Sequence, residues 1–110
     1  MDNISLTALA REQIEAARAA SSGRSSRTVY GGHEHTLRHT VIALAAGRSL
    51  DDHENPGEAT VYVLHGHVRV VAGETSWRGA PGHLITVPDA RHRLEAEDDA
   101  AVLLSTAMRR

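Results

Sequence analysis

Turn-forming residues recur at short intervals from residue 28 onward, and this spacing constrains the fold more than any other feature of the sequence. Between the turns, apolar and polar residues alternate, which is typical of short β-strands with one buried face. Many short strands without intervening helices favour an antiparallel sandwich or a small barrel. The expected strands are 28–30, 35–46, 59–65, 67–72, 75–79, 83–88, 91–97 and 100–107.

Residues 5–20 have a different pattern, which predicts a helix. Ser5 can cap this helix, because its hydroxyl can accept a hydrogen bond from an early backbone amide. Apolar residues recur on one side at helical spacing. These residues are Leu6, Leu9, Ala10, Ile14 and Ala17. Since 21–27 is a stretch of small residues, we expect an N-terminal helix and linker at 1–27 and a β-barrel at 28–110.

The composition excludes several classes of function. Hydrophobic residues make up 41% of the 110 residues and the formal net charge is −2. One globular domain is therefore expected, without the basic excess that holds a nucleic-acid backbone. Cysteine is absent, which excludes disulfides, thiolate metal ligands and a thiol nucleophile. Neither a signal-peptide pattern nor a membrane-spanning apolar run is seen, so we expect a soluble cytoplasmic protein that binds neither nucleic acid nor membrane.

Histidine is unusually frequent, with eight residues, and strand alternation sorts these side chains. On strand 91–97, His92 shares a face with Leu94, while the opposite face carries charged residues. We therefore expect His92 inside the barrel. His39 has the parity of core-directed residues later in its strand and could enter the barrel mouth. The histidines expected at the surface are His33, His35, His65, His67 and His83.

The stretches 47–66 and 82–96 resemble the two sequence motifs of the cupin superfamily. The positions that match the first motif are held by Gly47, His53, Asn55, Ala59 and Gly66. Those that match the second are held by Gly82, Pro88, Ala90, His92 and Ala96, with one residue between Ala90 and His92 where the family has two. The resemblance covers roughly residues 36–107. It implies an all-β fold, the double-stranded β-helix or cupin jelly-roll barrel, here with an N-terminal α-helix.

Family members usually hold a divalent metal with two histidines and a glutamate of the first motif and the histidine of the second. By this resemblance the chain keeps His53 and His92, but Asn55 and Ala59 replace the other two ligands. Glu58 is one residue away from the glutamate position and can ligate only if a bulge reverses its face. The resemblance therefore implies at most a partial site for Zn, Ni, Fe or Mn. The candidate ligands are His53, Asn55 and His92, with Glu58 and His39 as further candidates.

Two functions remain open from the sequence, beside a structural role as a dimerisation partner in a larger assembly for which no feature argues specifically, and whether the protein is an enzyme is undecided. The first is a module that binds or senses a small polar metabolite, with His53 and His92 as hydrogen-bonding pocket residues. The second is a metal-dependent enzyme, of oxygenase or isomerase type, with the same two histidines as ligands. The expected pocket lining is His39, Val61, Tyr62, Val63 and Leu94. A homodimer is also expected from the resemblance, and because barrel edges and the apolar stripe of the helix need cover.

Overall fold

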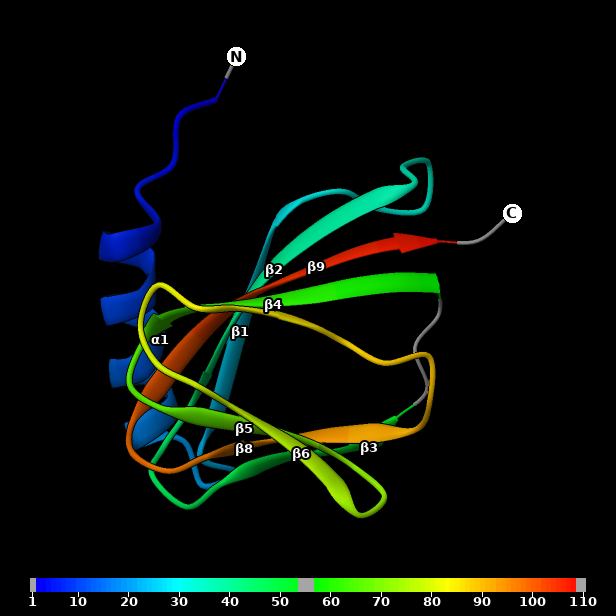
Figure 1. Cartoon of the computed structure of the whole chain (residues 1–110). Helices are drawn as coiled ribbons and strands as arrows, with labels where there is room; N and C mark the ends of the chain where they lie inside the picture. The colour runs from blue at the N-terminus through cyan, green and yellow to red at the C-terminus, as the bar shows by residue number, and fades with distance from the viewer. Residues whose placement is uncertain (1, 54–56, 109–110) are drawn as a thin grey trace.

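The computed structural model describes residues 2–53 and 57–108, and it contains one helix followed by a series of β-strands (Figure 1). The elements are α1 (Leu6–Ala19), β1 (Arg24–Tyr30), β2 (Leu37–Leu44), β3 (Ser49–His53), β4 (Gly57–His65), β5 (Val68–Ala72), β6 (Thr75–Gly79), β7 (Leu84–Thr86), β8 (His92–Ala96) and β9 (Ala100–Met108). Among the described residues, no helix is both long and apolar enough to cross a membrane.

The strands form two antiparallel sheets that face each other. The larger sheet has five strands in the order β1-β2-β9-β4-β7, and the smaller sheet has four in the order β3-β8-β5-β6. One apolar core fills the space between them. Its buried members are Ile42, Leu44, Val61, Val63, Val68, Val70, Ile85, Val87, Leu94, Ala96, Ala100 and Val102. The predicted all-β architecture with an N-terminal helix is therefore confirmed.

Helix α1 covers part of the outer face of the larger sheet (Figure 1). Its N-cap is Ser5, whose hydroxyl accepts a hydrogen bond from the amide of Ala8 at 3.2 Å, as predicted. A second apolar cluster joins the helix to the sheet, and small side chains on both sides allow close approach. It consists of Ala10, Ile14, Ala17, Ala43, Leu64 and Ala101. The apolar stripe of the helix is thus covered by the chain itself and does not need a second subunit.

Strands β1 and β3 differ most from the sequence-based expectation. Strand β1 begins at Arg24, inside the stretch 21–27 that was expected to be a linker. Strand β3 lies at Ser49–His53, where no strand was expected. Serine, arginine and paired aspartates weaken the strand signal in both segments. Both strands lie at the edge of their sheet, where one side of the ladder is left unpaired and polar residues are tolerated.

Candidate functional site

His92 is the buried polar residue of the barrel. It stands at the start of β8 and is 5% exposed, and among the described residues no other polar or charged side chain is classed as buried. The ring lies on the wall of an interior cavity of about 20 Å³. The other lining residues are Ile42, Leu50, Val61, Val70, Val87, Leu94, Val102 and Leu104. The inward position expected from strand alternation is therefore the one observed.

A backbone contact fixes the tautomer of this ring. Nδ1 of His92 lies 2.9 Å from the carbonyl oxygen of Ala90. Because a carbonyl only accepts hydrogen bonds, Nδ1 must carry the proton and donate it. The neutral ring then has its lone pair on Nε2, which is the arrangement that metal-binding and ligand-binding histidines commonly use.

The backbone of His53 lies opposite His92. The two residues are Cα partners in the β3–β8 ladder, and Leu50 is the partner of Leu94. From Leu50 to His53 the chain advances three residues along β3, while the paired positions on β8, Leu94 and His92, are only two residues apart. Strand β3 therefore contains one extra residue, a bulge, between Leu50 and His53. Without this extra residue, position 52 would stand opposite His92. Two segments that are distant in the sequence and match different motifs are therefore brought together by a local irregularity of one strand.

The other candidate ligands are not part of this arrangement. Asn55 lies outside the described residues. Glu58 is exposed on the outer face of the larger sheet, because β4 pairs with β9 in regular register from Gly57 to Val63. The bulge that would have turned Glu58 toward the barrel is absent from this stretch. Glu58 therefore points away from the interior cavity.

His39 also lies outside the barrel, which corrects its expected place at the mouth. Its Nδ1 is 2.7 Å from the hydroxyl of Ser105, and its ring centroid is 6.2 Å from that of Tyr30. It lines a shallow surface hollow together with Ile4, Tyr30 and Leu37. The physical reason is that β2 is buried on both faces: Ile42 and Leu44 face the barrel, whereas Ala43, which has the parity of His39, packs under the helix.

The expected pocket residues divide in the same way. Val61 and Leu94 line the interior cavity. Val63 is fully buried in the core but is not on the cavity wall. Tyr62 points to the outer face of the larger sheet and is 38% exposed. Tyr62 therefore lies away from the interior cavity.

The described residues do not make a metal centre. Among them, no group of three or more histidine, cysteine, aspartate or glutamate side chains lies close enough to hold an ion. The cavity wall contributes one imidazole, whereas a zinc site normally has at least three protein ligands. The side chains of His53 and Asn55 are not among these groups, because they lie outside what the structure describes.

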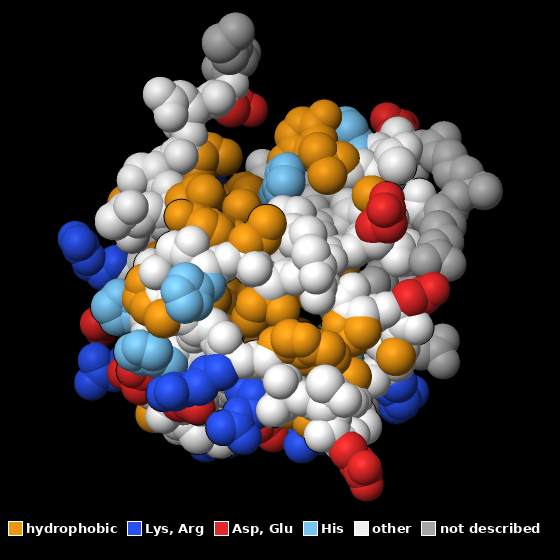
Figure 2. Space-filling view, viewed as in Figure 1, with side chains coloured by type: hydrophobic (Ala, Val, Ile, Leu, Met, Phe, Trp, Pro, Cys, Tyr) orange, Lys and Arg blue, Asp and Glu red, His pale blue; other side chains and the backbone are white. Residues whose placement is uncertain are grey.

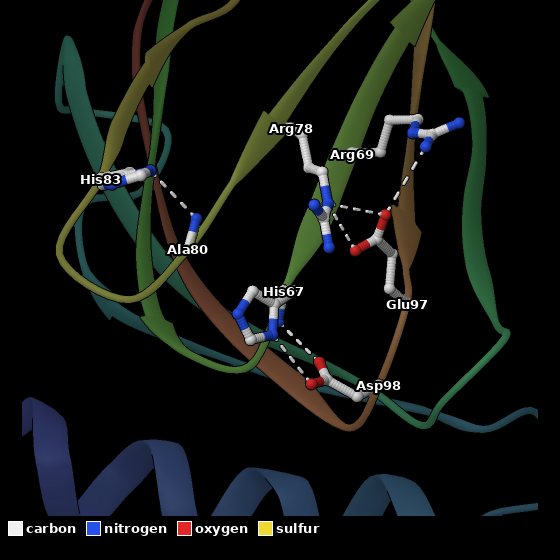
Figure 3. A network of polar contacts seen from close by, with 7 residues as sticks. All are labelled: His67, Arg69, Arg78, Ala80, His83, Glu97 and Asp98. Atoms are coloured by element: carbon white, nitrogen blue, oxygen red, sulfur yellow. Dashed lines mark hydrogen bonds and ion pairs between the residues drawn. The ribbon is translucent and has the colours of Figure 1, made fainter.

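A polar network on the outside of the smaller sheet was not anticipated from the sequence (Figure 3). Asp98 accepts two hydrogen bonds from His67, one from its backbone amide at 2.6 Å and one from Nδ1 at 2.9 Å. The side-chain hydrogen bond from His67 is the main cause that lowers the pKa of Asp98. Beside it, Glu97 accepts two hydrogen bonds from Arg78 Nε, at 2.8 and 3.0 Å, and lies 3.6 Å from Arg69.

This network has a structural role. Asp98 lies in the turn before β9 and His67 lies in the turn before β5, so their contact fastens two turns at one end of the barrel (Figure 3). The sequence signal here is the pair Asp98-Asp99, which is typical of a turn. The expected surface positions of the remaining histidines are observed. His33, His35, His65 and His83 are exposed, and His67 is partly exposed.

Comparison with known proteins supports the fold. No model of a known protein family matches the chain, and no curated protein sequence matches it. Among solved structures, the TT1209 protein of Thermus thermophilus is 24% identical over 100% of both chains, with a TM-score of 0.75. A cupin superfamily protein of Desulfitobacterium hafniense is 16% identical over 78% of each chain, with a TM-score of 0.71. An RmlC-like cupin protein of Desulfovibrio desulfuricans is 23% identical over 76% of this chain and 81% of that chain, with a TM-score of 0.67.

Two facing antiparallel sheets, a shared apolar core and these neighbours agree with the resemblance of the two sequence motifs. The chain therefore has the fold of the cupin superfamily, built as one small jelly-roll barrel with helix α1 on the outer side of its larger sheet.

Proposed function

We propose that this protein is a small-molecule-binding module whose site lies inside the barrel beside His92. The observation that carries the proposal is one buried imidazole on an otherwise apolar wall. Its Nδ1 is hydrogen-bonded to the carbonyl of Ala90, and no buried side-chain polar atom of the described residues lacks a partner, so the imidazole is held in this wall without an unsatisfied group. A binding role gives a reason for this choice of residue, because an apolar pocket with few polar groups is the usual form of a ligand site.

The wall also indicates the chemistry of the ligand. A polar group of the ligand would hydrogen-bond to the imidazole of His92, and an apolar body would contact Val61, Val70 and Leu94. This differs from the polar metabolite expected from the sequence, because the described lining is apolar apart from His92. We therefore expect a mostly hydrophobic compound with a single polar end.

The size of the cavity sets a condition on binding. About 20 Å³ is room for roughly one water molecule, whereas ligand pockets usually measure about 300–1,000 Å³. A ligand must therefore move side chains of the wall outward when it enters. Binding should consequently change the hydrogen exchange of amides in β8 and β4, which supply His92 and Val61.

The test is a thermal-shift screen of small hydrophobic alcohols, amides and acids against the full chain, followed by NMR mapping of the compounds that raise the melting temperature. The proposal predicts perturbed resonances at His92, Leu94 and Val61. The matched control is His33→Ala, which removes an exposed histidine and should leave every shift unchanged. If the perturbed resonances lie on the outer face instead, or if no compound binds, the barrel site is rejected.

A metal-dependent enzyme is the second candidate, and one observation favours it. His53 and His92 are partners in the β3–β8 ladder, which is where the family resemblance requires two ligands to meet. Such a site would need donors in addition to His92, since the described wall contributes one imidazole. The test is the metal content of the purified protein by mass spectrometry. Stoichiometric metal that is lost in both His53→Ala and His92→Ala, but kept in His33→Ala, would favour the enzyme over the binding module.

A further inference from the structure

One side of the barrel is an open seam between the two sheets. Strand β7 ends the larger sheet and β6 ends the smaller sheet, and these two edge strands approach each other at few positions. The seam is tight at Gly79, where an added Cβ would lie 2.9 Å from Cδ1 of Ile85. Beside it lies a surface hollow of about 500 Å³, which we call the seam hollow. Its lining residues are Trp77, Arg78, Gly82, His83, Leu84, Ile85 and Thr86.

Two residues of the seam hollow are direct neighbours of the interior cavity. Trp77 is the Cα partner of Val70 in the β5–β6 ladder, and Ile85 is the partner of Val61 in the β4–β7 ladder. Cross-strand partners lie side by side on the same face of a sheet. Val70 and Val61 both line the interior cavity beside His92. The seam hollow and the cavity therefore adjoin across these apolar side chains.

The seam hollow supplies the space that the interior cavity lacks. Its volume of about 500 Å³ lies within the range of about 300–1,000 Å³ that is usual for ligand sites, whereas the cavity has about 20 Å³. Figure 2 shows this side of the molecule, where hydrophobic side chains lie on both sides of a narrow gap near the centre of the view. A ligand whose body stays in the seam hollow has to pass only its polar end through the wall.

Trp77 determines which kind of ligand body the seam hollow accepts. It is the only tryptophan of the chain, and its side chain is 38% exposed although it shares the inward face of Val70. The indole has a flat face, on which aromatic rings pack in offset or edge-to-face contacts. The other side of the seam is aliphatic, with Leu84 and Ile85. A planar ring therefore suits these two walls better than a bulky saturated one.

The charged and titratable groups of the seam hollow are already engaged. Nε of Arg78 donates to both carboxylate oxygens of Glu97, at 2.8 and 3.0 Å, so its charge is compensated. The amide of Ala80 donates to Nδ1 of His83 at 3.1 Å, and this nitrogen therefore carries no proton. The ring of His83 is thus neutral. Because no uncompensated charge faces the seam hollow from these two residues, a neutral ligand fits it better than an anion.

The separation of Trp77 from His92 sets the length of the ligand. Trp77 and Leu94 are two strands apart, with Val70 between them, and His92 is two residues along β8 from Leu94. With about 4.8 Å between strands and about 3.4 Å per residue, the Cα atoms of Trp77 and His92 are about 12 Å apart. Both side chains extend into this span. A compound of two fused rings can therefore contact the indole with its body and the imidazole with its polar group.

We propose that the ligand enters the barrel through the seam between β6 and β7, and that it is a neutral planar ring compound with one polar group, selected by Trp77. Since the polar group is placed at His92, this proposal rests on the proposed function. Trp77 then determines specificity, and a saturated compound of the same shape class binds more weakly than a planar one.

The experiment uses the full chain, with 2-naphthol as the planar probe and decahydro-2-naphthol as its saturated counterpart, which has the same carbon skeleton and hydroxyl group. Because the chain has one tryptophan, its indole N–H gives a single resonance in a nitrogen–proton correlation NMR spectrum. We expect 2-naphthol to shift this resonance and those of His92. Its dissociation constant should be lower than that of decahydro-2-naphthol by about fivefold or more.

The variants separate the flat face of the indole from its apolar surface. Trp77→Leu keeps an apolar side chain without a ring, and we expect the ratio of the two dissociation constants to fall to about one. Trp77→Phe keeps a smaller ring and should retain part of the preference. The matched control is Ser76→Ala, which changes the adjacent residue on the opposite face of β6 and should leave both constants unchanged. Because the ratio is taken within one protein, a general loss of stability does not imitate the effect.

Shifts at both Trp77 and His92, with a planar preference that disappears in Trp77→Leu, support the proposal. Shifts at His92 with an unchanged indole resonance overturn it but leave the barrel site standing, because the probe then enters elsewhere. An indole shift without a change at His92 overturns both the bridging contact and the barrel site for this probe. Equal affinity of the wild type for the two probes also overturns the proposal. If neither probe binds while compounds of the thermal-shift screen still perturb His92, the role of Trp77 is rejected and the proposed function is kept.

Discussion

His53 stands directly opposite His92 in the β3–β8 ladder because β3 accommodates one extra residue between Leu50 and His53. This bulge brings together the two histidines that the sequence motifs place 39 positions apart, by their numbers in the chain. His92 is buried on the inner wall beside Leu94 and Val61.

Truncation of His92 should destabilise the barrel. His92→Ala removes a buried ring and its hydrogen bond to the carbonyl of Ala90, and we expect a loss of about 2–4 kcal/mol in the free energy of unfolding. His33→Ala, at an exposed position, should change stability by less than about 0.5 kcal/mol. Denaturant titration measures both values. If His92→Ala and His33→Ala had the same free energy of unfolding, the burial of His92 and its hydrogen bond to Ala90 would be contradicted.

The contact between Asp98 and His67 should make stability depend on pH in acid. The pKa of Asp98 is lowered from its ordinary value of 3.8, so the carboxylate stabilises the fold fully above that value. The contribution is lost as the pH falls below 3.8 and through the lower pKa of the folded protein. Because the side chain is 53% exposed, we expect the effect to be about 1 kcal/mol or less.

The measurement is the free energy of unfolding against pH for wild type and Asp98→Asn. The two curves should be separated near neutral pH and should converge in strong acid. Glu74→Gln serves as the control, since Glu74 lies exposed in the β5–β6 turn, and its curve should follow that of wild type throughout. Curves for Asp98→Asn and wild type that coincide near neutral pH would contradict the proposed role of this contact.

Gly66 should tolerate no side chain. Its φ of 73° is left-handed, and an added Cβ would collide with the carbonyl of Asp99 and lie 2.9 Å from Cα of Ala100. Gly73 has a similar φ of 59° but has no atom within 4 Å of its Cβ position. We therefore expect Gly73→Ala to cost about 1 kcal/mol from backbone strain alone, and Gly66→Ala to cost roughly 2–4 kcal/mol. Denaturant titration measures the loss of stability in both variants. If Gly66→Ala and Gly73→Ala lose the same free energy of unfolding, the close contact between Gly66 and residues 99–100 is refuted.

The packing of helix α1 on the sheet should be sensitive to volume at one position. Ala17 is fully buried against the cluster that contains Ala43 and Ala101, whereas its neighbour Ala16 is exposed. Ala17→Leu should therefore destabilise the protein by about 1–3 kcal/mol through overpacking. Ala16→Leu makes the same chemical change and should be nearly neutral. A melting experiment in which both variants behave alike would mean that the helix does not dock in this way.

Much of the fold could be predicted because strand alternation and turn residues are local signals. Alternation puts Val61 and Val63 on one face of strand 59–65 and Tyr62 on the other, whereas the expected pocket lining included all three; Val61 and Val63 lie in the core and Tyr62 is exposed. The parity of His39 was also correct, but the buried face that it shares packs under α1 and not inside the barrel. Alternation shows that a strand is covered on both sides, and it does not show which side faces the barrel. That distinction depends on where the helix docks.

The candidate site could be predicted less well, because it depends on long-range pairing. The sequence did not predict the edge strand β3, because it contains Asp51 and Asp52 and acidic residues are rare in strands. The bulge in β3 has no sequence signal of its own, although it determines which residue stands opposite His92. The contact between His67 and Asp98 joins two turns about 30 residues apart in the sequence, which no local pattern can reveal.

The central claim is that a small molecule binds inside the barrel against His92, and calorimetric titration tests it most directly. The ligand is the strongest binder from the thermal-shift screen, and the proteins are wild type, His92→Ala, His92→Gln and His33→Ala. The account predicts that the dissociation constant rises by about tenfold or more in His92→Ala, rises less in His92→Gln, which keeps an acceptor, and is unchanged in His33→Ala. Equal affinity of all four proteins for the ligand would contradict it.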